Sequence, residues 1–148
     1  MIVMLSAGAK ITKFSIFGAY VSAEGGSYTD YSEMWRHANG MLFPVLISYV
    51  YLLFYKSNSE KNFYRIFSFY AGLVPAASIL AWIVTPVSFM SGNAPPGDDV
   101  SDFLFIFTKY GHPLFVGFAA VVFIGISVML MVKKRVIHNY VEVVKGLR

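Results

Sequence analysis

The chain has 148 residues, of which 57% are hydrophobic and only 14% are charged, and it contains no cysteine. This length allows at most one domain, and the charged fraction lies well below the roughly 25% typical of soluble domains, which favours a membrane protein. The absence of cysteine excludes disulfides, thiolate metal sites and cysteine nucleophiles. The net charge of +4 does not indicate nucleic-acid binding, because the basic residues gather at the ends of apolar segments instead of forming a stripe among exposed aromatics.

Residues 1–23 allow three interpretations. Lys10 and Lys13 interrupt an apolar run and leave residues 14–23, about 15 Å of helix, which is half a bilayer. The small residues at 21–23 could end a signal peptide. The helical spacing of the two lysines on one face instead indicates an interfacial helix. The third interpretation is a fourth spanning helix with both lysines near its cytoplasmic end or facing the bundle.

Three apolar stretches without any charged residue predict transmembrane helices over residues 38–55, 66–90 and 113–132. Each is close to or above the roughly 20 residues that cross a bilayer core. The predicted fold class is therefore an all-α integral membrane protein with three core transmembrane helices plus the N-terminal interfacial or fourth spanning helix. Residues 1–148 form a single membrane domain that ends in the tail 133–148.

The charges between these stretches are sorted by sign and predict an orientation. The loop 56–65 carries Lys56, Lys61 and Arg65, whereas the loop 91–102 carries aspartates and no basic residue. Basic flanks stay on the cytoplasmic side. We therefore expect the basic loop 56–65 and the C-terminal tail to be cytoplasmic and the loop 91–102 to be external.

The second stretch contains small residues at the spacing that lets membrane helices approach closely, namely Gly72, Ala76, Ala77 and Ala81. Pro44, Pro75 and Pro86 are expected to kink their helices. Residues 101–110 either form a separate short helix on the outer surface or continue the third helix. Pro113 favours a break, since proline is well tolerated in the first turn of a helix.

Two histidines on inward-running helices fall at nearly the same depth. His37 lies about 27 Å above residue 55, and His112 lies about 30 Å above residue 132, at 1.5 Å per residue. Arg36 and Lys109 accompany them on an otherwise acidic side.

This outer layer has three interpretations. The first is an interfacial belt of Trp, Tyr and snorkelling cations. The second is a pocket for an anionic headgroup, a quinone or an acidic partner, with Arg36 and Lys109 as the binding residues. The third is a haem held by His37 and His112 as axial ligands. No metal site is expected, because further ligands are scarce.

No catalytic residues are predicted, since the sequence lacks a phosphate loop, a zinc-protease motif and paired intramembrane carboxylates. The favoured function is a non-catalytic integral membrane subunit that packs in a homo- or hetero-oligomeric complex. Its expected partners are the lipid bilayer and other membrane subunits or further copies of the chain, and no nucleic acid. The alternatives are a haem- or ligand-binding redox subunit and a small membrane regulator or immunity-type inhibitor.

Overall fold

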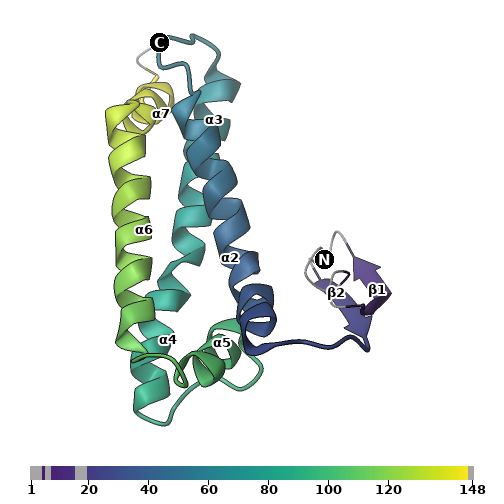
Figure 1. Ribbon diagram of the computed structural model, residues 1–148. Helices are drawn as coiled ribbons and strands as arrows, with labels where there is room; N and C mark the ends of the chain where they lie inside the picture. The colour runs from purple at the N-terminus through teal and green to yellow at the C-terminus, as the bar shows by residue number, and fades with distance from the viewer. Residues whose placement is uncertain (1–4, 6–7, 16–19, 147–148) are drawn as a thin grey trace.

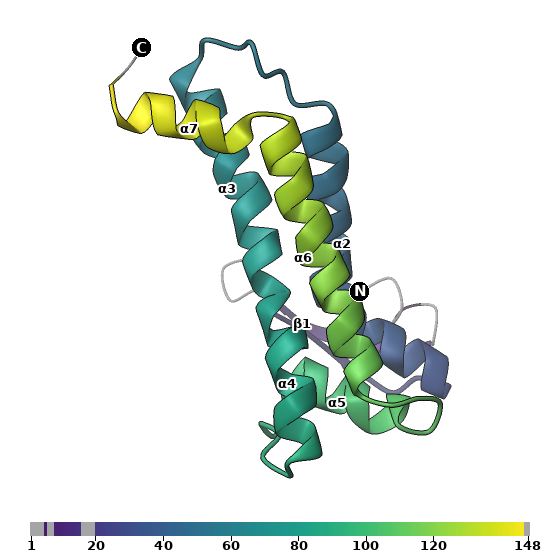
Figure 2. The same ribbon diagram turned by 90° about the vertical axis from the view of Figure 1, so that its left-hand side faces the viewer.

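The computed structural model describes residues 5, 8–15 and 20–146. Its elements are β1 (Lys10–Ser15), β2 (Tyr20–Glu24), α2 (Asp30–Leu53), α3 (Asn62–Ser78), α4 (Leu80–Met90), α5 (Asp99–Phe107), α6 (Leu114–Lys133) and α7 (Val136–Val144). Helices α2, α3–α4 and α6 run side by side as a bundle, while α5 crosses one end and α7 crosses the other (Figure 1, Figure 2). The predicted all-α architecture is confirmed for this bundle.

The N-terminal segment differs from the prediction. Its described residues form an antiparallel hairpin in which Lys10 pairs with Glu24 and Ser15 pairs with Tyr20, so neither an interfacial helix nor a fourth spanning helix is present over residues 10–15 and 20–24. The physical reason is composition: β-branched and aromatic residues such as Ile11, Thr12 and Val21 favour strands. The predicted signal-peptide site at residues 21–23 lies within β2.

The second predicted stretch is one long apolar segment divided into α3 and α4 at Ile79. Pro86 cannot donate a backbone hydrogen bond to the carbonyl of Trp82, and its ring pushes that carbonyl away. The backbone tightens next to this point, where the Trp82 N–H bonds the Ile79 carbonyl at 2.9 Å. The break at Ile79 thus falls between Pro75, which lies inside α3, and Pro86, which lies inside α4, and Pro44 lies inside α2 without interrupting it.

Residues 99–107 form the separate helix α5, and a non-helical connection joins it to α6. The Asp98 side chain accepts a hydrogen bond from the Ser101 N–H and so begins α5, while Pro113 occupies the N-cap of α6. The tail is also ordered into α7. Arg135 adopts the left-handed conformation, with φ of 61°, and turns the chain sharply between α6 and α7.

Among the residues that the structure describes, two helices are long and apolar enough to cross a membrane, the 29-residue segment Asn62–Met90 and the 20-residue helix Leu114–Lys133. Only 22% and 28% of their most apolar windows are buried within the protein, unlike the core helix of a soluble domain. The first predicted stretch forms the later part of α2. Because the first turns of α2 are polar, this helix does not count among those that are apolar enough to cross a membrane.

The bundle is apolar outside and partly polar inside. Large side chains such as Phe43, Val74, Val84 and Phe118 are each more than half exposed. Buried between the helices are the hydroxyl-bearing residues Ser48, Ser68, Thr85 and Ser127. Tyr51 and Ser68 share a hydrogen bond of 2.6 Å, which joins α2 to α3 and satisfies both hydroxyl groups.

Candidate functional site

The end of the bundle crossed by α5 holds an ionic layer between α2 and α5. Helix α2 begins with a capping box in which Thr29 and Ser32 satisfy each other's backbone N–H groups. This cap sets the first turn of α2 beside α5, and the acidic side chains of both first turns suit the positive ends of the helix dipoles. The predicted residues Arg36, His37, Lys109 and His112 all belong to this end of the molecule (Figure 1).

His37 is buried, and both of its ring nitrogens have partners. Nδ1 lies 2.9 Å from a carboxylate oxygen of Asp99 at the start of α5. Nε2 lies 3.0 Å from the Arg36 guanidinium and 3.6 Å from a carboxylate oxygen of Glu33. Arg36 in turn pairs with Glu33 at 2.8 Å. His37 therefore acts as a polar link between α2 and α5, and an iron atom could bind its ring only after one of these contacts is broken.

Lys109 joins the other end of α5 to the first turn of α2. Its ammonium donates to both carboxylate oxygens of Asp30, at 3.1 and 3.0 Å, and the Tyr110 hydroxyl donates to the same carboxylate at 2.8 Å. The hydrogen bond from Lys109, with that from Tyr110, holds the pKa of the Asp30 carboxyl below its usual value. The bond to Asp30 raises the pKa of the Tyr110 hydroxyl above its usual value.

His112 lies in the short connection between α5 and α6 and is exposed. Its Nδ1 accepts a hydrogen bond of 3.3 Å from the Leu114 backbone N–H. Within the described part of the chain, no interaction joins His112 to His37. The described residues also contain no group of three or more His, Asp or Glu side chains placed to hold a metal ion. The structure thus brings Arg36 and His37 together but gives each histidine a different environment. The haem assignment stays a prediction without support from this geometry.

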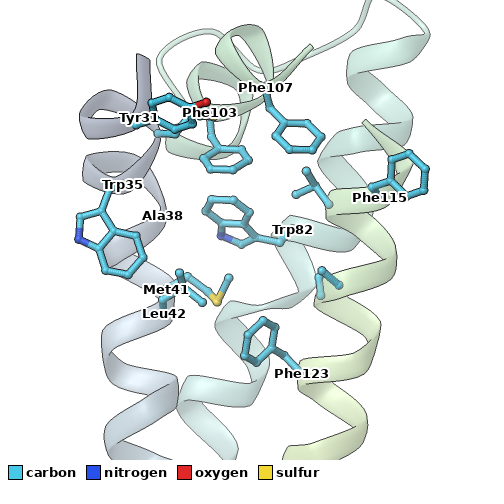
Figure 3. A pocket seen from close by; sticks show the side chains of 14 residues that line it. Tyr31, Trp35, Ala38, Met41, Leu42, Trp82, Phe103, Phe107, Phe115 and Phe123 are labelled. Atoms are coloured by element: carbon cyan, nitrogen blue, oxygen red, sulfur yellow. The ribbon is translucent and has the colours of Figure 1, made fainter. Parts of the chain in front are cut away.

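Directly inside the ionic layer is a cavity of about 440 Å³ between α2, α4, α5 and α6. Its volume lies within the range of small-molecule sites. The walls are apolar and strongly aromatic (Figure 3). The aromatic lining residues are Tyr31, Trp35, Trp82, Phe103, Phe107, Phe115 and Phe123.

The rings of this cavity support one another. Trp82 extends from α4 into the middle of the lining and meets Phe103 edge-on, with ring centroids 5.1 Å apart (Figure 3). Phe103 stacks on Phe107, one turn further along α5, at 5.7 Å. Aromatic contacts of this kind hold ring orientations more firmly than aliphatic packing does. The cavity is therefore a preformed space with flat walls.

The small residues predicted to pack helices divide into two groups. Gly72 is buried against α6, and a Cβ atom there would lie only 3.0 Å from the Met131 sulfur. Ala76 is half-buried, whereas Ala77 and Ala81 are exposed on the outside of the α3–α4 segment. Close approach within the chain is thus supplied by Gly72, and the two exposed alanines contribute no packing between its own helices.

The opposite end of the bundle holds a second polar cluster that the sequence analysis did not single out. Arg65 is fully buried between α3 and α7, where its Nη1 lies 3.2 Å from a carboxylate oxygen of Glu142. Asn139 is buried beside it and donates to the Tyr55 hydroxyl and to the Ser57 carbonyl, both at 2.8 Å. Lys134 donates to the Leu53 carbonyl and so satisfies the C-terminal end of α2.

The cavity was also missed by the sequence analysis, although one signal for it existed. Phe103 and Phe107 are separated by one helical turn and so share a face of α5. The alternation of Phe103, Phe105 and Phe107 is instead typical of a strand, in which all three side chains would share one face. Phe105 is in fact 70% exposed and lies outside the lining.

Comparisons with known proteins give no match: no family model, no curated protein and no solved structure is significantly similar to this chain.

Proposed function

We propose that this protein is a non-catalytic integral membrane subunit in which α2, α3–α4 and α6 cross the bilayer. The observation that carries the proposal is the arrangement of apolar and polar groups: large apolar side chains face outward along the bundle, while hydroxyl groups are buried and paired inside it. A hydrocarbon solvent favours this arrangement, because water is absent and polar groups must find partners within the protein. Water would penalise the same surface, since apolar patches of this extent are rare on soluble monomers.

The proposed orientation places the α7 end of the bundle in the cytoplasm. That end carries the basic residues of the loop 56–65 and of the segment after α6, whereas the α5 end carries most of the acids. The polar clusters at the two ends, Arg65 with Glu142 and Asp30 with Lys109, then lie near the two membrane surfaces.

Single cysteines test this orientation because the natural chain has none. Ser57→Cys and Asn93→Cys both introduce the thiol at an exposed position, and Asn93 is preferable to Gly92, whose φ of +75° strains any side chain. We expect an impermeant maleimide to label Asn93→Cys on intact cells and to label Ser57→Cys only after lysis. Labelling of Ser57→Cys alone on intact cells contradicts the orientation. Labelling of both on intact cells contradicts an odd number of membrane crossings between them.

Association with other membrane helices is the second part of the proposal. Ala77, Ser78 and Ala81 are exposed on one segment, and small side chains let a partner helix approach closely where lipid supplies no hydrophobic driving force. We expect Ala77→Leu combined with Ala81→Leu to reduce the yield of the assembled complex in mild detergent at least several-fold. Size-exclusion chromatography with light scattering measures the assembly.

The control is Val128→Leu, which enlarges an exposed apolar residue on a different helix, α6, and leaves the small-residue surface of the α3–α4 segment unaltered. This variant is expected to assemble as the natural chain does. An unchanged assembly in the double alanine variant indicates that this surface faces lipid, and it then contradicts the subunit proposal at this contact.

A further inference from the structure

The aromatic cavity is lined by one largely buried side chain whose polar group makes no hydrogen bond within the described chain. Trp82 is only 6% exposed, and its indole N–H makes no hydrogen bond with any residue that the structure describes. The two other polar groups of the lining, on Tyr31 and Trp35, belong to side chains that are at least half exposed and can be solvated. When an occupant displaces water from an apolar site, an indole N–H there needs an acceptor on the occupant. The cavity therefore presents a single donor to whatever fills it.

The charges near the cavity argue for a neutral occupant, because its lining contains no charged side chain. Arg36 and Lys109 are each bonded to a carboxylate of this chain, Glu33 and Asp30 respectively. Binding an anion would require one of these ion pairs to open, and the remaining acid would repel the ligand. The binding of an anionic headgroup by Arg36 and Lys109 stays a prediction, and it would have to compete with these ion pairs.

The walls favour a flat ring over a flexible chain. Trp82, Phe103 and Phe107 present ring faces and edges at fixed orientations, with centroid distances of 5.1 and 5.7 Å. A conjugated ring can add to this set of stacked and edge-on contacts, each of which contributes beyond simple burial. A lipid acyl chain makes no such contact and loses rotational freedom when it is ordered. Phe115 at the surface is 66% exposed, so the cavity can be entered from the side of the bundle.

We propose that the cavity binds a neutral, lipid-soluble molecule of the quinone class. Its ring lies against Phe103 and Phe107, and one ring carbonyl oxygen accepts a hydrogen bond from the indole N–H of Trp82. The site requires neither His37 nor His112, and it requires no metal ion. It also does not depend on the association surface at Ala77 and Ala81.

The experiment uses the intrinsic fluorescence of the purified full chain in dodecyl maltoside, titrated with decylubiquinone. The chain has two tryptophans, and both line the cavity. We expect saturable quenching, in contrast to the linear quenching that partitioning into micelles produces. Trp82→Phe keeps the ring but removes the donor, and it is expected to weaken binding about 3- to 10-fold, the effect of one neutral hydrogen bond. Trp35 also lines the cavity and remains in this variant, so quenching of its fluorescence reports the binding there.

A second variant tests the cavity without altering Trp82. Ala119 lines the cavity but is exposed, so Ala119→Phe narrows the space with little strain on the core, and saturable quenching should disappear. Val122→Phe adds the same group nearby on α6, outside the lining, and should bind normally.

Three results of the quinone titrations overturn the proposal. They are quenching that remains linear in the natural chain, equal affinities of the natural chain and a folded Trp82→Phe variant, and unchanged binding in Ala119→Phe. Dihexanoyl phosphatidylcholine provides the remaining arm. A lipid ester carbonyl can accept the hydrogen bond of Trp82 just as a quinone carbonyl can. If this lipid saturably displaces the quinone at concentrations below its critical micelle concentration, the cavity binds an ester lipid and the quinone assignment is wrong.

Discussion

Replacing Arg65 with alanine is expected to lower the free energy of unfolding by about 3 kcal/mol, since removing one partner of a buried ion pair leaves the other without compensation. The Arg65 side chain is fully buried and donates from Nε to the Ser59 carbonyl at 2.7 Å and from Nη1 to Glu142 at 3.2 Å. The truncation also opens a cavity between α3 and α7. Nη2 has no partner among the described residues, which places the expected loss at the lower end of the range for buried ion pairs. Thermal unfolding of the detergent-solubilised protein, followed by circular dichroism, measures the effect.

Lys61→Ala is the matched control, because Lys61 is exposed one helical turn before Arg65 and carries the same charge. We expect this variant to change stability by no more than about 0.5 kcal/mol, as is usual for surface positions. A double-mutant cycle with Glu142→Ala isolates the ion pair. Strictly additive losses in that cycle contradict a direct Arg65–Glu142 interaction, and equal stabilities of Arg65→Ala and Lys61→Ala contradict the structural role of Arg65 altogether.

The bundle was largely predictable because hydropathy is a local property of the sequence. The charge-free stretches at 66–90 and 113–132 coincide with α3–α4 and α6, and the break before α6 follows from Pro113. Helix α2 begins at Asp30, earlier than the apolar stretch, because a capping box and not hydrophobicity sets its first turn. Hydropathy therefore locates the apolar part of a helix but not the polar turns that precede it.

The N-terminal hairpin was not predictable by the same route. Lys10 and Lys13 are compatible with one face of a helix, and their spacing outweighed the β-branched residues between and around them. The hairpin instead depends on pairing β1 with β2, in which Lys10 lies opposite Glu24. Two short strands carry a weak periodic signal, and a lone hairpin is only marginally stable in water.

The position of the candidate-site residues along the bundle was predictable, but their contacts were not. Counting residues along the helices places Arg36, His37 and Lys109 at one end of the bundle, where the structure has them. The partners of these residues come from distant segments: Asp99 is 62 residues from His37, and Asp30 is 79 residues from Lys109. Rise per residue says nothing about which way a helix is rotated, so the aromatic cavity and the neutralised cations required the folded chain.

Gly72→Leu is expected to lower the free energy of unfolding by about 1–3 kcal/mol, the usual cost of overpacking a tight interface. A Cβ atom at Gly72 would already lie 3.0 Å from the sulfur and 3.2 Å from Cγ of Met131, and the further carbons of leucine must displace α3 from α6. Gly72→Ala should have a much smaller effect, because the Met131 side chain is flexible and can shift by a few tenths of an ångström.

The control for this series is Ala77→Leu, which enlarges an exposed position on the same helix and should leave the unfolding transition of the solubilised protein unchanged. Thermal unfolding in detergent measures all three variants under one condition. If Ala77→Leu is destabilised and Gly72→Leu is not, the assignment is wrong, and Ala77 instead of Gly72 lies on the face of α3 that packs within the chain. The expected order, with a loss only at Gly72, separates packing within the chain from packing between chains. Any loss of assembly in the variants at Ala77 and Ala81 then reports on a partner helix, because the fold that carries those residues is intact.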